Sequence, residues 1–162
     1  LLLDIGIEAM KIGELEAAGK IAREMILDFG QDDGSLGYDE AAHVGNTILG
    51  RIELQKGNKQ KAIEYLMISI KAPLRKQDGW LSEVNISLAK ELATAGERDA
   101  VIEFLKQCEE LPYLKKEAAL YADQIKKMKL WQSELKAGKV PNFRFYEPVS
   151  GKTTVPSVRV RP

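Results

Sequence analysis

One histidine and one cysteine are the residues of this sequence whose types most often act as nucleophiles, bases or metal ligands. His43 and Cys108 are the only residues of their kinds among 162. A zinc site needs three or four such ligands, and a cysteine nucleophile needs a histidine base beside it. Cys108 falls on an apolar helical stripe, where a free cysteine behaves as a small buried side chain. We expect His43 at a helix start or a groove edge, and we predict no catalytic residue, no metal site and no cofactor.

Three short motifs resemble functional sites but lack necessary residues. The SGKT run at 150–153 resembles a phosphate loop, yet Tyr146 stands where that motif needs a glycine. The acidic run at 32–34 lacks the alternating oxygen ligands and closing glutamate of a calcium loop. Asn85 opens a glycosylation sequon, but it lies in a predicted packed helix. These motifs therefore add no chemistry, and we expect a protein that is not an enzyme.

The overall charge is balanced, with 24 basic and 24 acidic side chains. A net charge of zero creates no global field that would favour nucleic acid or an anionic membrane. No apolar run approaches the roughly 20 residues that cross a bilayer. We therefore predict no nucleic-acid partner and no membrane insertion. A single cysteine forms no internal disulfide, so the sequence leaves cytoplasmic and periplasmic or secreted locations equally open.

The chain repeats itself at a spacing of 39 residues. Of the 28 residue pairs that this shift aligns between 46–73 and 85–112, 7 are identical, whereas average composition would give about two. Self-similarity at such a period indicates a stacked structural unit. The identical pairs are Asn46 with Asn85, Leu49 with Leu88, Gly57 with Gly96, Ile63 with Ile102, Glu64 with Glu103, Leu66 with Leu105, and Pro73 with Pro112.

Each copy has the period of a helix on both sides of a glycine. Apolar residues recur three or four positions apart before and after Gly57, and again around Gly96. Glycine suits such a turn because the residue that ends a helix often adopts a left-handed conformation. Pro73 and Pro112 are expected to stop the second helix of each copy. An earlier, partial copy has Gly13 at the turn position.

These patterns predict an all-α domain over residues 1–137, followed by an extended or disordered tail. From Asn142 onward the chain has three prolines and no helical period. The last helix has one apolar stripe and a lysine-rich back, as the terminal element of a stacked array requires. The expected elements are helix-turn-helix pairs at about residues 1–30, 38–73 and 80–112, a capping helix at 114–137 and a tail at 138–162.

The copies resemble the tetratricopeptide repeat, whose signature runs Trp-x2-Leu-Gly-x2-Tyr, then Ala-x3-Phe, then Pro. Three departures stand beside the matches: Asn46 and Asn85 occupy the aromatic position, Glu53 occupies the tyrosine position, and the spacings of 44 and 39 residues exceed the usual 34. The whole run is also similar to a group of bacterial tetratricopeptide-repeat proteins. The matching residues are Leu49-Gly50, Ala62, Leu66 and Pro73; Leu88-Ala89, Val101, Leu105 and Pro112; and Gly6, Ala18 and Ala22.

The resemblance implies a right-handed α-solenoid whose first helices line a concave, partner-binding face. Arg51 and Lys90, equivalent by the 39-residue shift, would form a basic row for an acidic peptide or a terminal carboxylate; alternatively they are two solvated charges. Glu83 and Ser87 stand where the chaperone-tail clamp of some family members needs basic residues. The candidate partner-binding residues are Asn46, Thr47, Arg51, Gln55, Lys90 and Thr94.

The implied function is a non-catalytic protein-protein interaction or scaffold module. Two alternatives remain. The chain is an accessory domain of a larger enzyme or signalling protein, or it is a self-assembling subunit that covers the apolar end at Leu1, Leu2, Leu3 and Ile5 with another copy. The basic tail either docks on an acidic partner or is a solvated end.

Overall fold

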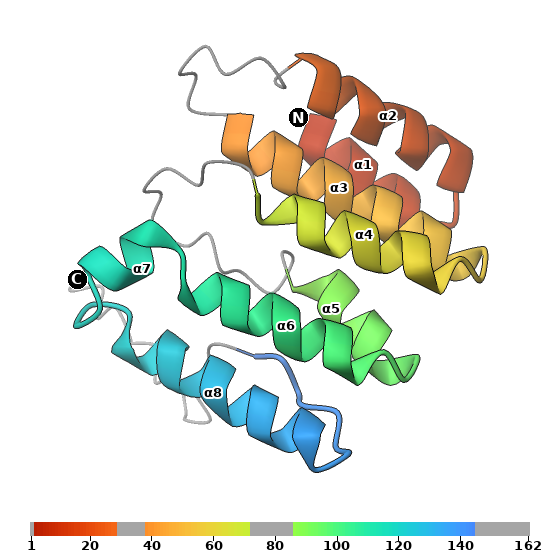
Figure 1. The fold of residues 1–162 in the computed structure, drawn as a ribbon. Coiled ribbons are helices and arrows are strands. Elements are labelled where there is room, and N and C mark those ends of the chain that lie inside the picture. The colour runs from red at the N-terminus through yellow and green to blue at the C-terminus, as the bar shows by residue number, and fades with distance from the viewer. Residues whose placement is uncertain (1, 29–37, 72–85, 145–162) are drawn as a thin grey trace, which may run out of the picture.

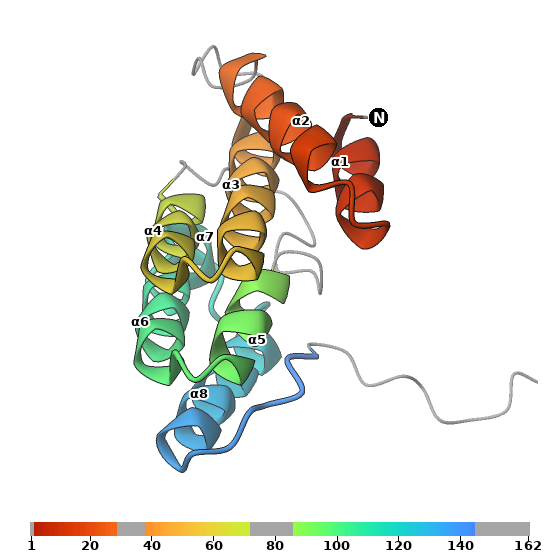
Figure 2. The same cartoon turned by 90° about the vertical axis from the view of Figure 1, so that its right-hand side faces the viewer.

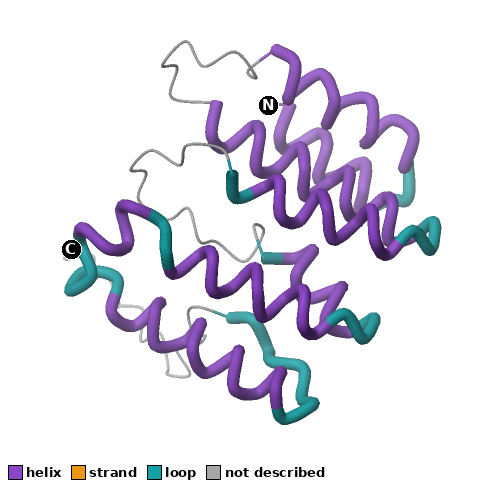
Figure 3. The backbone as a smooth tube through the Cα atoms, in the orientation of Figure 1, coloured by secondary structure: helices purple, strands orange, loops and turns teal. Residues whose placement is uncertain are grey.

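All the regular secondary structure in the described part of the chain is helical. A computed structural model describes residues 2–28, 38–71 and 86–144, which form eight helices and no strand (Figure 3). The all-α prediction is therefore confirmed for these residues. The helices are α1 (Leu2–Lys11), α2 (Leu15–Asp28), α3 (Tyr38–Gln55), α4 (Lys59–Ser69), α5 (Ser87–Thr94), α6 (Arg98–Glu109), α7 (Pro112–Lys116) and α8 (Ala122–Lys136).

Several predicted features lie outside the described residues. They include the junctions after α2 and α4, Pro73, Glu83, Asn85, the SGKT run, and the tail from residue 145 onward. At the apolar end expected for self-assembly, the side chains of Leu1, Leu2 and Leu3 also lie outside, whereas Ile5 is 45 % exposed.

Glycine turns join the helices of three pairs, α1 with α2, α3 with α4, and α5 with α6. Gly13, Gly57 and Gly96 have φ angles of 85°, 83° and 96°, in the left-handed region that glycine enters without a steric penalty. In each turn the next residue donates its N–H to a carbonyl five residues back, as Asn58 does to Glu53 at 2.8 Å. This bond satisfies one of the carbonyls that a helix end leaves free. The three turns lie at one end of the helices (Figure 1).

The pairs pack on one another in chain order. Helix α3 packs against both α2 and α4, and α5 packs against α3, α4 and α6. Figure 2 shows α3 above α5 in one layer and α4 above α6 in the other, with α1 and α2 at one end and α8 at the opposite end. Helix α8 packs against α6. None of the helices in the described ranges is long and apolar enough to cross a membrane.

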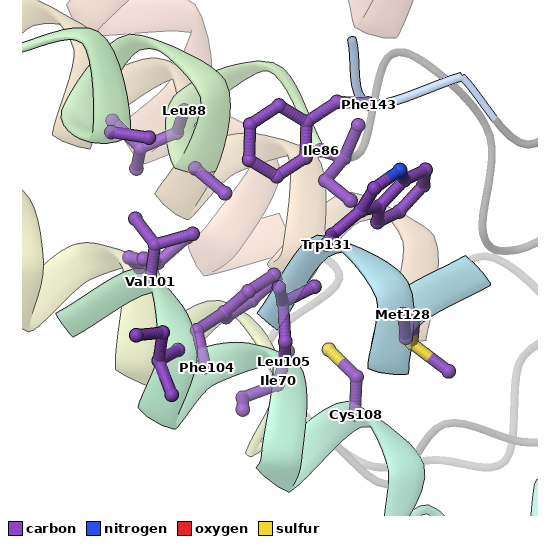
Figure 4. Close-up of a cluster of buried hydrophobic side chains, with 14 of the residues drawn as sticks. Ile70, Ile86, Leu88, Val101, Phe104, Leu105, Cys108, Met128, Trp131 and Phe143 are labelled. Carbon is purple, nitrogen blue, oxygen red and sulfur yellow. The ribbon is translucent and has the colours of Figure 1, made fainter. Parts of the chain in front are cut away.

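The predicted apolar stripes form the core. In α4 the side chains of Ala62 and Leu66 are buried, and in α6 Val101, Leu105 and Cys108 are buried. One buried cluster joins α4, α5, α6 and α8, and a second joins α1, α2 and α3. Figure 4 shows the first cluster, where side chains of α6 face Trp131 of α8 and Leu88 of α5.

Gly50 lets three helices meet. A Cβ atom on Gly50 would overlap Cδ2 of Leu88 in α5 and would lie 3.1 Å from Cβ of Tyr65 in α4. Leu88 is fully buried, so it has little room to move away. The small residue that the repeat pattern places here is therefore required by the approach of α5 to α3.

The capping helix predicted over residues 114–137 is interrupted. Helix α7 ends at Lys116 and α8 begins at Ala122, because the chain tightens into a turn in which Leu120 donates its N–H to the carbonyl of Glu117 at 2.9 Å. The turn leaves Leu120 69 % exposed while Tyr121 is buried. Pro112, expected only to stop a helix, opens α7, where its missing donor costs nothing.

The packed part of the chain continues past the predicted end of the domain at residue 137. Residues 138–144 are described and are not helical. Within them Pro141 is buried and Phe143 is only 2 % exposed. The burial of an aromatic ring supplies enough apolar area to hold a short non-helical segment in place.

Candidate binding groove

A groove lies between α5 and the segment that follows α8. Its volume is about 470 Å³, within the range of protein sites that bind small molecules or side chains. Figure 2 shows this segment running from the end of α8 toward α5. The groove is lined by Ile86, Ser87, Lys90, Glu91, Thr94, Asn142, Phe143 and Arg144.

Two of the six predicted partner-binding residues line this groove. Lys90 and Thr94 are exposed and lie one helical turn apart on α5. Thr94 donates its hydroxyl to the backbone carbonyl of Lys90 at 2.9 Å. The Lys90 ammonium makes no hydrogen bond or ion pair with any residue of the described ranges, so it is available to an incoming anion.

Arg51 is engaged with Glu91. From α3, its Nε lies 2.9 Å and 3.0 Å from the two carboxylate oxygens of Glu91 in α5, and its Nη2 lies 2.6 Å from Oε1. This two-pronged geometry is the strong form of a charge-assisted hydrogen bond. The pair neutralises both charges, so the basic row expected from Arg51 and Lys90 is reduced to Lys90.

The other predicted residues do not meet in the groove. Asn46 and Thr47 are buried in α3. The Asn46 amide donates to the carbonyl of Ala42 at 2.7 Å, and the Thr47 hydroxyl finds no hydrogen-bond partner among the described residues. Gln55 is exposed at the end of α3 and does not line the groove. In this conformation neither Asn46 nor Thr47 is accessible to a partner.

The far wall of the groove comes from residues that sequence reasoning placed in the tail. Asn142 and Arg144 are exposed, and the Arg144 carbonyl accepts a hydrogen bond from Lys127 Nζ at 3.1 Å. With Glu91 neutralised by Arg51, the free charges on the groove walls are positive. One feature of the sequence could have indicated this wall. Gly138 follows α8 as the other turn glycines follow their helices, and it has a φ of 80°.

A second cavity of about 370 Å³ lies between α2, α3 and α4. One of its lining carboxylates, Glu53, accepts a hydrogen bond from Asn58 at 2.8 Å and lies 3.4 Å from Lys56 Nζ and 4.0 Å from Lys61 Nζ. The Asn58 hydrogen bond, and then the two lysines, lower the pKa of Glu53 against the opposing effect of burial. Glu53 is therefore already satisfied by its neighbours. The groove beside Lys90 is the stronger candidate because two of the predicted partner-binding residues line it, whereas none lines the second cavity.

His43 has a structural role. It lies in the second turn of α3 and is buried, so the expectation of a helix start or groove edge is wrong. Its Nδ1 lies 2.9 Å from the carbonyl oxygen of Ser69 at the end of α4, and this oxygen accepts the hydrogen bond. The contact joins the two helices of the pair.

Cys108 is buried as predicted, and burial followed by the nearby charge of Glu109 raises the pKa of its thiol. A neutral thiol is a poor nucleophile. We therefore expect Cys108 to react with a thiol reagent on the order of 10³ times more slowly in the native protein than after unfolding in urea, because access requires the core to open. The absorbance released by an aromatic disulfide reagent measures both rates, and rapid native labelling would contradict the burial.

No group of three or more histidine, cysteine, aspartate or glutamate side chains in the described part of the chain is arranged to hold a metal ion. Comparison with known proteins adds no functional residue. No family model, no curated protein and no solved structure matches the chain, so the candidate groove rests on its own geometry.

Proposed function

We propose that the chain is a tetratricopeptide-like repeat protein that acts as a non-catalytic protein-protein interaction or scaffold module. In this proposal its three helix pairs form a right-handed solenoid closed by α8. Support comes from the 39-residue repeat, the left-handed glycine turns and the small residue at Gly50 where three helices meet.

One observation carries the binding role: an uncompensated lysine lines a preformed groove. Lys90 stands beside the hydroxyls of Ser87 and Thr94, while the only carboxylate in the lining, Glu91, is held by Arg51. Because the Thr94 hydroxyl already donates to the Lys90 carbonyl, the Lys90 ammonium and the Ser87 hydroxyl are the side-chain donors of α5 left for a ligand. A cation next to a hydroxyl donor favours a carboxylate. The partner in this proposal is an extended or helical protein segment with an acidic residue that faces Lys90.

Selection from a random peptide library on the immobilised protein tests this proposal. We expect the enriched peptides to be acidic, and Lys90→Glu to weaken their binding about tenfold or more, because it replaces attraction with repulsion. Helix content measured by circular dichroism should not change, since Lys90 is exposed.

Lys106→Glu is the matched control. Lys106 is also an exposed lysine, on α6, where it lies 3.8 Å from Glu103 and does not line the groove, so its reversal should leave peptide affinity unchanged. Failure to enrich any acidic sequence, or equal binding by the Lys90→Glu variant, would overturn the assignment.

A further inference from the structure

The helix α8 resembles the first helix of a fourth repeat, but the described residues that follow it, 138–144, form no second helix. Seven residues before the turn glycine the three earlier units have Gly6, Gly50 and Ala89, whereas α8 has Trp131. A large side chain at this position prevents the close approach that a paired helix needs. Residues 139–144, which we call the strap, follow the Gly138 turn without regular secondary structure.

The strap is anchored by one aromatic side chain. The Phe143 ring is 2 % exposed and its centroid lies 5.3 Å from that of Trp131, with the ring planes at 50°. Figure 4 shows the ring near Ile86 at the start of α5 and near Trp131 of α8. We call the space that the ring fills the aromatic slot. Lys127 Nζ holds the strap further along, through the Arg144 carbonyl at 3.1 Å.

Phe143, the anchor residue, has an unfavourable backbone conformation. Phe143 has a φ of 55° and is the one non-glycine residue with positive φ in the described ranges. The left-handed region is disfavoured for bulky L-residues. Such strain persists only where the surrounding structure enforces it, and it is common at ligand clamps and switch regions. A segment that inserted an aromatic ring with a relaxed backbone would avoid this cost.

We propose that the aromatic slot is a recognition pocket for an aromatic side chain of a partner's extended segment, and that the strap occupies it until such a segment displaces it. The chain's own phenylalanine shows which chemistry the slot takes: a flat apolar ring against Trp131 and Ile86. The strap is also a wall of the Lys90 groove, so its release opens that groove to a longer ligand. This inference rests on the proposed binding function and adds to it an aromatic residue in the partner.

The test asks whether the slot accepts its own segment from solution. The probe is a capped peptide with the sequence of residues 138–144, GKVPNFR, and its control has alanine in place of phenylalanine. The receptor is the full chain with Phe143→Ala, in a Trp80→Phe background so that Trp131 gives the only tryptophan emission. Titration should shift the Trp131 emission to shorter wavelength with GKVPNFR but not with the alanine peptide.

The chain that retains Phe143 should bind GKVPNFR about tenfold more weakly than the Phe143→Ala variant. A strap on a short tether competes at an effective concentration on the order of millimolar. Equal affinity for both chains, or equal binding of the two peptides, would overturn the proposal.

A second measurement keeps the test decisive if Phe143→Ala impairs folding. A nitroxide attached at Arg144→Cys reports the mobility of the strap, because Cys108 is buried. GKVPNFR at millimolar concentration should narrow its spectrum, and an unchanged spectrum would contradict displacement. Lys90→Glu should not weaken the binding of GKVPNFR. Failure of the groove assignment and failure of the slot assignment can therefore be distinguished.

Discussion

Replacing Gly50 with alanine is expected to lower the free energy of unfolding by up to about 2 kcal/mol, although alanine is the better helix former. Overpacking a core costs about 1–3 kcal/mol, and the gain in helix propensity returns about 1 kcal/mol. The added methyl group would overlap Leu88 and press on Cβ of Tyr65 at 3.1 Å. Urea unfolding followed by circular dichroism measures the change.

Gly19→Ala is the matched control. Gly19 is also a helical glycine, but its Cβ would meet only the side-chain ends of Ile52 and Arg23, at 3.3 Å and 3.4 Å. These ends have room to adjust, so we expect Gly19→Ala to leave stability unchanged or to raise it by up to about 1 kcal/mol.

Leu88→Ala completes a cycle with Gly50→Ala. Alone it should cost about 2–5 kcal/mol, because it leaves a cavity around a fully buried side chain. In the double variant the methyl group added at position 50 enters the space that the Leu88 side chain vacates, so the combined loss should fall short of the sum by about 1 kcal/mol. Strict additivity would show that the two residues do not contact each other as described.

The elements that could be predicted are those that local rules determine. Helical period, turn glycines and stopping residues act within a few positions of the chain. For this reason the turns at Gly57 and Gly96 and the buried stripe of α6 agree with expectation. Gly50 follows the same pattern, because a small residue recurs at its position in the next copy, where it is Ala89.

The break between α7 and α8 and the burial of Phe143 could not be predicted in the same way. Residues 117–121 have ordinary helix-forming side chains, and the turn appears only where Tyr121 enters the core. Phe143 lies in a proline-containing segment without a period. Its burial depends on Trp131 and Ile86, which are distant in sequence and become neighbours only after folding.

The candidate site was predicted in part for a related reason. The 39-residue shift aligns Arg51 with Lys90, and these residues lie in α3 and α5, each six positions before its turn glycine. It does not say which side chain of α5 faces Arg51, because that depends on how the two helices are rotated about their axes. The facing residue is Glu91, one position after Lys90. Because Arg51 pairs with Glu91, its guanidinium joins the two helices and is not free to bind a partner.

Arg51→Glu is therefore expected to destabilise the fold, rather than to change binding alone. The substitution places a second carboxylate against Glu91, where the two native side chains are 24 % and 36 % exposed. We expect a loss of about 1–2 kcal/mol in the free energy of unfolding, above the value for a fully exposed pair because the two-pronged bond is partly shielded from water. Lys90→Glu, one residue from Glu91 but exposed, should change stability by less than about 0.5 kcal/mol.

Exchanging the charges separates the pair from other effects of the substitution. Glu91→Arg alone should also destabilise the protein, whereas Arg51→Glu combined with Glu91→Arg should recover most of the loss, because an ion pair of opposite sense forms between α3 and α5. The destabilisation by Arg51→Glu should shrink in 1 M salt, since screening weakens the carboxylate repulsion. Urea titrations of the four chains measure these values. An Arg51→Glu variant as stable as Lys90→Glu would show that the contact between Arg51 and Glu91 does not join the two helices.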